Sequence, residues 1–122
     1  MVNVVLWGTQ VLLALVFGFS AVIKGTQSRQ RAVALGMTGV ANVPVPVMRF
    51  TAACEALGVI GLFAPWLGGV FPILTPLAAL GLGVIMVCAA RIHLGLRETT
   101  TVAGNVLLLG LCLVVAWGRW PQ

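Results

Sequence analysis

Four long apolar runs, interrupted by very few charges, constrain this chain more than any other feature of its sequence. They cover about residues 4–23, 50–67, 71–90 and 102–117. Only seven of the 122 residues are Lys or Arg and two are Asp or Glu, whereas a soluble domain carries about 25% charged residues. A spanning helix needs roughly 20 apolar residues. We therefore predict an all-α integral membrane four-helix bundle, formed as a single transmembrane domain over residues 1–122.

The connection between the first two runs is much longer than a hairpin requires. Residues 28–37 are typical of a short interfacial helix with Ser28 as its N-cap, although a plain mobile loop is the alternative. Pro44 and Pro46 are expected to end any helix there and to redirect the chain into the second span. The apolar segment 64–69 predicts a tight turn, which makes the second and third spans antiparallel neighbours.

The few basic residues predict an orientation. Six lie on one side of the expected bundle and only Arg119 lies on the other; the six are Lys24, Arg29, Arg31, Arg49, Arg91 and Arg97. Because Lys and Arg favour cytoplasmic loops, both termini should face outward. The tryptophans should form a belt at the outer interface: Trp7, Trp66, Trp117 and Trp120. No basic stripe interleaved with aromatic residues is present, so nucleic acid is not an expected partner.

Small residues inside the runs predict close helix packing, because lipid supplies no hydrophobic drive between helices. The glycines expected at helix contacts are Gly58, Gly61, Gly81, Gly83, Gly104 and Gly110. The three cysteines form no CxxC motif and no Cys/His cluster, so we expect them to pack in the core and predict no metal site.

Glu55 is the most informative single residue, because it lies inside the second apolar run. A carboxylate at that depth costs about 2.5–3.5 kcal/mol even on lenient insertion scales. It should therefore face the bundle interior and have a partner there. Thr51, Gly58 and Leu62 share its helical face, which supports an inward orientation.

Polar groups from the other spans lie at a similar depth and predict a shared cavity. The candidate catalytic residues are Glu55 and His93, and the candidate substrate-binding residues are Lys24, Arg49, Arg91, Ser20 and Asn105. Carboxyl and imidazole groups can exchange protons with a bound molecule, and arginines can bind an anionic or carbonyl oxygen. Simpler roles remain open for these residues. The basic side chains can serve only to set the topology, and His93 can lie at the membrane interface without a catalytic role. Glu55 can form a structural ion pair, and Asn105 can form an interhelical hydrogen bond.

Short motifs resemble those of the DoxX-like family of small membrane proteins. Residues 19–24 match the pattern F-x-x-x-x-K, residues 55–58 match E-x-x-G, and residues 89–93 resemble the exit of the third helix. The resemblance implies a four-helix protein of the bacterial inner membrane. Functions in that family include subunits of a thiosulfate:quinone oxidoreductase and accessory partners of membrane redox complexes. The EXPERA superfamily, which includes a sterol isomerase with buried acidic groups, is similar in design.

Three functions fit these features. The first is a membrane-embedded isomerase, cyclase or hydrolase that binds a lipophilic small molecule and uses acid–base chemistry without a cofactor. The second is a non-catalytic accessory subunit of a quinone-linked redox complex. The polar cluster would then hold the assembly together or contact the quinone. The third is a small exporter, although small multidrug resistance transporters carry their carboxylate in the first helix, which has no acid here. Association with further copies or with a redox partner stays open.

Overall fold

The structure, a computed structural model, describes residues 2–69 and 71–120, without the side chains of residues 65–67. These described residues form five α-helices and one 3-10 helix: α1 Val2–Thr26, α2 Arg29–Ala34, η1 Thr38–Val40, α3 Val45–Gly68, α4 Leu74–Gly95 and α5 Thr99–Gly118. The described ranges contain no strand. The prediction of an all-α four-helix bundle is therefore confirmed, and the short helix in the first connection is present.

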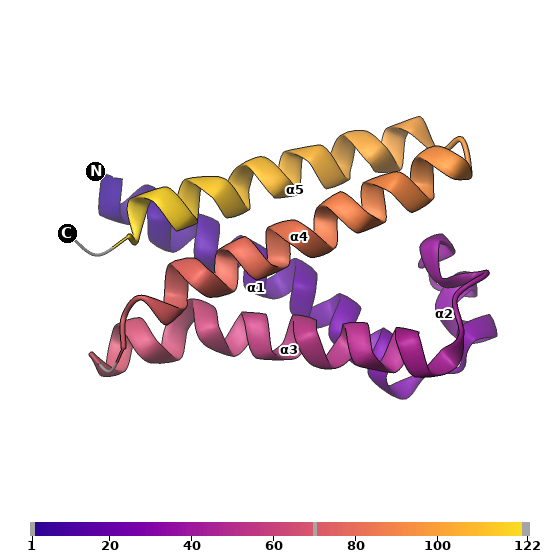
Figure 1. The fold of residues 1–122 in the computed structure, drawn as a ribbon, viewed down its shortest axis with the longest axis horizontal. Coiled ribbons are helices and arrows are strands. Elements are labelled where there is room, and N and C mark those ends of the chain that lie inside the picture. The colour runs from indigo at the N-terminus through magenta and orange to yellow at the C-terminus, as the bar shows by residue number, and fades with distance from the viewer. Residues whose placement is uncertain (1, 70, 121–122) are drawn as a thin grey trace.

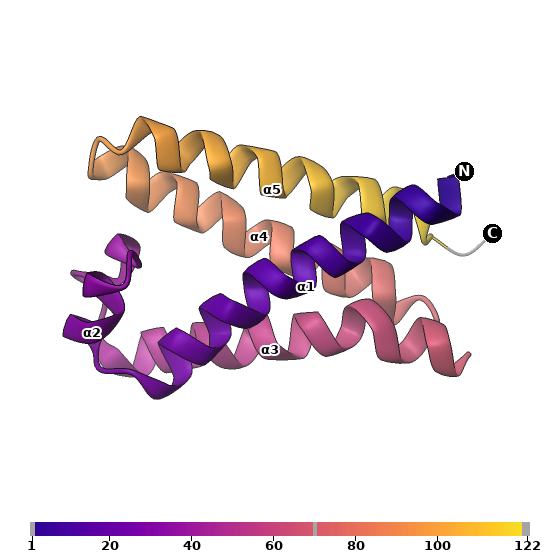
Figure 2. The same cartoon turned by 180° about the vertical axis from the view of Figure 1, so that it is seen from behind.

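The four long helices lie lengthwise, and both termini lie at one end (Figure 1). At the opposite end lie α2, η1 and the connection between α4 and α5. The strongest packing joins α4 to α5, α1 to α3, and α3 to α4. Seen from behind, α1 crosses the bundle obliquely, from the end of α5 to the beginning of α3 (Figure 2).

Each long helix has a length and composition that can cross a membrane. The outer surface carries large apolar side chains that the bundle leaves exposed, such as Leu15, Phe19, Phe50 and Leu107. In water these side chains would form extensive apolar patches, whereas in a bilayer they contact lipid.

Two helix boundaries differ from the expectation because of proline. α3 begins at Val45, so Pro46 lies in its first turn and does not end a helix. α4 begins at Leu74 rather than near residue 71, and Pro76 again lies in the first turn. The first N–H groups of a helix have no intrahelical acceptor, so a proline there removes no hydrogen bond. The turn expected over residues 64–69 correspondingly falls later, since α3 continues to Gly68.

The short helix α2 begins where its sequence predicts, but it ends at Ala34 rather than near residue 37. Ser28 is the N-cap, and its hydroxyl accepts a hydrogen bond from the Arg31 N–H. At the other end Gly36 adopts a φ of 102°, and Met37 N–H donates to the Ala32 carbonyl at 2.9 Å. This is a Schellman motif, which turns the chain towards η1 and favours glycine at the left-handed position.

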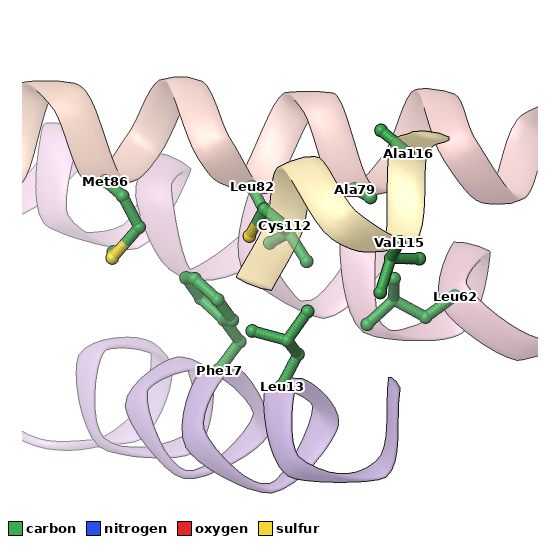
Figure 3. Packing of buried hydrophobic residues seen from close by; sticks show 9 residues of the cluster. All are labelled: Leu13, Phe17, Leu62, Ala79, Leu82, Met86, Cys112, Val115 and Ala116. Atoms are coloured by element: carbon green, nitrogen blue, oxygen red, sulfur yellow. The ribbon is translucent and has the colours of Figure 1, made fainter. Parts of the chain in front are cut away.

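The core of the bundle is an apolar cluster contributed by all four long helices (Figure 3). Figure 3 shows Leu13 and Phe17 of α1 facing Cys112 and Val115 of α5. These side chains are almost completely buried. Because lipid gives no hydrophobic drive between helices, close packing of this kind holds the bundle together.

Glycine contacts bear out only part of the packing prediction. A Cβ on Gly58 would lie 2.6 Å from Leu82, and one on Gly61 would lie 2.7 Å from Ala78, so both glycines permit α3 and α4 to approach. Gly83 likewise lies close to Leu109. For the other three the prediction was wrong, because a Cβ would meet nothing within 4 Å; these are Gly81, Gly104 and Gly110.

A polar cluster joins α1 to the end of α5. Arg119 is only 4% exposed and donates to Gln10 Oε1 at 2.7 Å and to Asn3 Oδ1 at 2.8 Å. Its guanidinium also lies 4.8 Å from the ring centroid of Trp7. Burial lowers the pKa of Arg119 from its ordinary value, because the charged form loses water. These contacts fix the position of α1 at the end of the bundle that carries the termini.

Candidate functional site

A cavity of about 860 Å³ lies in the other half of the bundle. Its wall comes from α1, α3, α4, α5 and the segment of residues 36–43 that includes η1. The oblique path of α1 accounts for this position. α1 contacts α3 both near its N-terminus, where Gln10 Nε2 donates to the Leu62 carbonyl, and near its C-terminus, where Lys24 meets Glu55. It meets the end of α5 near its own N-terminus, so α1 and α5 separate towards the end that carries η1. The lining is mostly apolar, with a small number of polar side chains.

One polar group in the wall is centred on Glu55, which is 1% exposed. Lys24 Nζ donates to Glu55 Oε1 at 3.2 Å, and the Ser20 hydroxyl lies 3.1 Å from both carboxylate oxygens. Ser20 and Lys24 are one turn apart on α1, so both reach the same point on α3. The predicted inward orientation of Glu55 is confirmed, and its partners are Lys24 and Ser20.

Arg49 lies beside this group but hydrogen-bonds to the backbone at the C-terminal end of α1. Its guanidinium donates to the carbonyls of Lys24 and Gln27, at 2.9 and 2.8 Å. The last carbonyls of a helix lack intrahelical donors and carry partial negative charge. Arg49 therefore satisfies the C-terminal end of α1 and holds Lys24 close to α3. It is not among the residues that line the cavity.

A second polar group forms where α4 turns into α5. Arg97 adopts a φ of 58°, and Glu98 N–H donates to the His93 carbonyl at 3.0 Å. This Schellman motif returns the chain so that Glu98 lies over His93. The side chains then meet, with His93 Nδ1 2.7 Å from Glu98 Oε1. Thr38 of η1 donates to the same carboxylate at 2.9 and 3.0 Å.

The Glu98 contacts fix the tautomer of His93. Hydrogen bonds from His93 and Thr38 lower the pKa of Glu98 below its ordinary value, so its carboxylate is ionised at neutral pH. An ionised carboxylate only accepts hydrogen bonds, so Nδ1 of His93 carries a proton. In the neutral imidazole Nε2 is then the acceptor. A Cβ on Gly39 would lie 3.1 Å from Nε2, so glycine at that position permits η1 to pack closely against the imidazole.

Asn105 contributes a third polar group, from α5. It is 8% exposed and lines the cavity. Its Nδ2 has no hydrogen-bond partner within residues 2–69 and 71–120. An unsatisfied buried donor costs about 1–3 kcal/mol. An interhelical hydrogen bond was the simpler role expected for Asn105. Its Nδ2 does not form such a bond with any of the described residues.

The structure thus brings together five of the seven predicted site residues. Ser20, Lys24, Glu55, His93 and Asn105 all line the cavity. Arg49 and Arg91 do not line it, and the side chain of Arg91 is exposed on the last turns of α4. Their positions at helix ends explain this, because long basic side chains extend towards the interface and away from an apolar interior.

Two features of the site were missed by sequence reasoning. The first is the pairing of Glu98 with His93; the signal was their five-residue spacing across a helix end, which a Schellman turn brings together. The second is the share of the wall contributed by residues 36–43, which apolar composition alone did not distinguish from a lipid-facing segment.

Comparison with protein families gives a match over most of the chain. A model described as the DoxX-like family matches residues 8–115, which include all of α3 and α4, most of α1 and α5, and the cavity residues. No curated protein matches the chain, and no solved structure matches it.

Proposed function

The chain belongs to the DoxX-like family and is a multi-pass membrane protein, and from this premise we propose that it binds a lipophilic small molecule in the cavity between its helices. Glu55 and His93 exchange protons with that molecule. Ser20, Lys24 and Asn105 bind it. The bound molecule approaches from the surrounding lipid, and the site lies towards the cytoplasmic end of the bundle in the bacterial inner membrane.

The observation that carries the proposal is the cavity itself. Its volume of about 860 Å³ falls within the roughly 300–1,000 Å³ typical of small-molecule sites. Its lining also follows the usual composition, with apolar walls and a few polar side chains that fix orientation. In a bilayer such a space excludes charged solutes and admits apolar ones.

The proposed acid–base chemistry rests on two groups from different helices. Glu55 comes from α3 and keeps accepting capacity, because a carboxylate offers about four lone-pair positions and Lys24 and Ser20 supply few donors. His93 comes from α4, with Nδ1 held by Glu98 and Nε2 beside Gly39. A molecule between them has a proton donor or acceptor on two sides, which proton-transfer reactions need.

For Arg49 and Arg91 the substrate-binding role stays a prediction. The hydrogen bonds of Arg49 to the end of α1 support a positioning role, since they hold Lys24 near Glu55.

A cavity-filling variant tests ligand binding. Ala89 lines the cavity, whereas Ala103 is exposed on the outside of α5, so Ala89→Phe and Ala103→Phe add the same ring inside and outside. Native mass spectrometry of protein extracted in lipid nanodiscs should show a bound molecule in the parent protein and in Ala103→Phe. It should be absent from Ala89→Phe. A parent protein with no bound molecule, or one retained equally by both variants, would contradict the proposal.

The molecule recovered in that experiment then tests the chemistry. Incubated with the parent protein in D₂O, it should incorporate deuterium or rearrange. The rate should fall by roughly 10²–10⁴-fold in Glu55→Gln, because the substituted amide cannot exchange a proton. Ser20→Ala, which removes a hydrogen bond to the same carboxylate, serves as the control and should lose far less. Equal rates in the parent and Glu55→Gln would exclude the acid–base role and leave binding intact.

A further inference from the structure

Asn105 occupies a position where an apolar residue would be more favourable for the fold. It lies inside α5, where asparagine is a poorer helix former than leucine. It is more than nine-tenths buried, and its Nδ2 meets no acceptor in the part of the chain that the structure describes. A polar side chain at membrane depth normally faces the bundle interior or a cavity and has a hydrogen-bond partner there. Asn105 lines the cavity, although Nδ2 itself has almost no accessible surface, so the amide must turn towards the cavity for its donor to meet an acceptor there.

The face of α5 that carries Asn105 supports this direction. Thr101 and Leu108 line the same cavity, and the spacing of 101, 105 and 108 places them on one helical face. This face therefore carries the amide of Asn105 between a hydroxyl at one end and an apolar side chain at the other. A ligand that lies along it would meet polar groups towards η1 and apolar groups towards the core.

The charges around the cavity indicate which kind of acceptor oxygen the Asn105 amide can bind. Three acidic or basic side chains line it, namely Lys24, Glu55 and His93. Lys24 and Glu55 neutralise each other at 3.2 Å, and His93 is bound to Glu98 outside the lining. A ligand with a carboxylate or an ammonium group would thus be buried without a counter-charge, which is strongly unfavourable.

We propose that Asn105 determines ligand specificity by donating a hydrogen bond from Nδ2 to an uncharged oxygen, so that the cavity selects neutral amphiphiles with a hydroxyl or ketone group. This inference rests on the proposed function, since it names the class of molecule that the same cavity takes. Charged amphiphiles are excluded by the paired charges, and pure hydrocarbons bind more weakly because they leave the Asn105 donor unsatisfied.

A series of twelve-carbon probes with different head groups tests the inference. The probes are 1-dodecanol, 2-dodecanone, dodecane, dodecylamine and dodecanoate, each added to nanodiscs at equal mole fraction in the bilayer. Native mass spectrometry measures the fraction of protein that carries a probe. The parent protein should bind the alcohol and the ketone about tenfold more tightly than dodecane, the ratio expected for one buried hydrogen bond. The two charged probes should not bind.

Two variants assign the preference to Asn105. Asn105→Leu should bind all three neutral probes alike. Thr100→Val, which removes an exposed hydroxyl of α5 outside the cavity lining, should keep the preference and serves as the control. Without ligand, Asn105→Leu should also have a higher melting temperature than the parent protein, because an unsatisfied donor is replaced by a good helix former. A structural role for Asn105 would instead lower that temperature.

The outcomes separate this inference from the proposed function. If the parent protein binds dodecane and 1-dodecanol equally, or if Asn105→Leu keeps the preference, the inference is overturned while ligand binding stands. If the charged probes bind best, the argument from paired charges is overturned. If none of the five probes binds, both the inference and the proposed function are overturned.

Discussion

A single carboxylate, that of Glu55, connects the first two spans at the level of the cavity. Its position could be predicted from the sequence, because a charge inside an apolar run must face inward. Its partner could not be chosen in advance among Lys24, Arg49 and Arg91, since all three lie near the same helix ends. The choice of Lys24 depends on the crossing of α1 over α3, which apolar periodicity does not encode.

We expect Glu55→Gln to destabilise the protein. The substitution leaves Lys24 without its counter-charge at a site where the lysine is 15% exposed. Removing one partner of a buried pair costs about 3–5 kcal/mol, and we expect the lower end because Lys24 lies near the end of α1. A thermal melt in detergent measures the loss.

The double variant Lys24→Met/Glu55→Gln provides the control for this melt. It removes both charges and should recover most of the lost stability. If the single variant melts like the parent protein, the ion pair contributes nothing to the fold.

Arg97 is a residue where the native backbone is unfavourable for its side chain. It adopts a φ of 58° at the end of α4, and its side chain is exposed. Arg97→Gly should therefore stabilise the protein by about 0.5–1 kcal/mol, because glycine takes this conformation without steric cost. Arg91→Gly in the same helix is the matched control and should destabilise by about 1 kcal/mol. A lower melting temperature for Arg97→Gly would contradict the expectation.

Among the elements, the first connection shows what local chemistry can and cannot predict. The Ser28 cap and the short helix follow from residue types whose hydrogen bonds are local, and both are present. Pro46 lies in the first turn of α3 and not at a helix end, because proline is tolerated in the first turn as well as beyond the last. The contact of η1 with Glu98 joins residues 60 positions apart, so no local pattern could reveal it.

The Glu98 contacts should make the η1 segment sensitive to acid. The pKa of Glu98 is lowered in the folded protein, so these contacts stabilise the fold above the ordinary glutamate value of 4.5. That stabilisation is lost as the pH falls through the lower folded value. Histidine protonation alone does not break the contact, because Nδ1 carries a proton in both forms of the ring.

Amide hydrogen exchange at residues 38–40 measures this release. Protection should be constant from neutral pH down to about 5, once corrected for intrinsic exchange rates, and should fall below the ordinary glutamate pKa. In Glu98→Gln protection should be low throughout, with no acid transition. If Glu98→Gln keeps the acid transition, a group other than Glu98 causes the loss of protection.

At the scale of the whole molecule, the separation of basic residues from tryptophans predicted which helix ends lie together. Both termini lie at one end and the polar connections at the other. Trp7 and Trp117 belong to the end with the termini, whereas the side chain of Trp66 lies outside the described residues. The cavity could not be predicted from this sorting, because it depends on the angle at which α1 crosses its neighbours.

We predict that both termini face outward and that η1 lies in the cytoplasm, because of the six-to-one distribution of basic residues. Single cysteines at Gln30 and Val2, both exposed, test this in a background that lacks the three native cysteines. An impermeant reagent applied to intact cells should label Val2→Cys and not Gln30→Cys. The reverse pattern would invert the orientation.

The oblique course of α1 ties the cavity to the thickness of the bilayer. α1 has 25 residues and is about 37 Å long at ~1.5 Å per residue, whereas the hydrocarbon core is about 30 Å thick. A helix longer than the core tilts to fit. In thicker bilayers α1 should stand more upright, which moves its Lys24 end towards α5 and narrows the space between them. We therefore expect 1-dodecanol to bind less well in nanodiscs of long-chain phosphatidylcholine than in those of short-chain lipid, and equal binding would show that the crossing angle is fixed by packing alone.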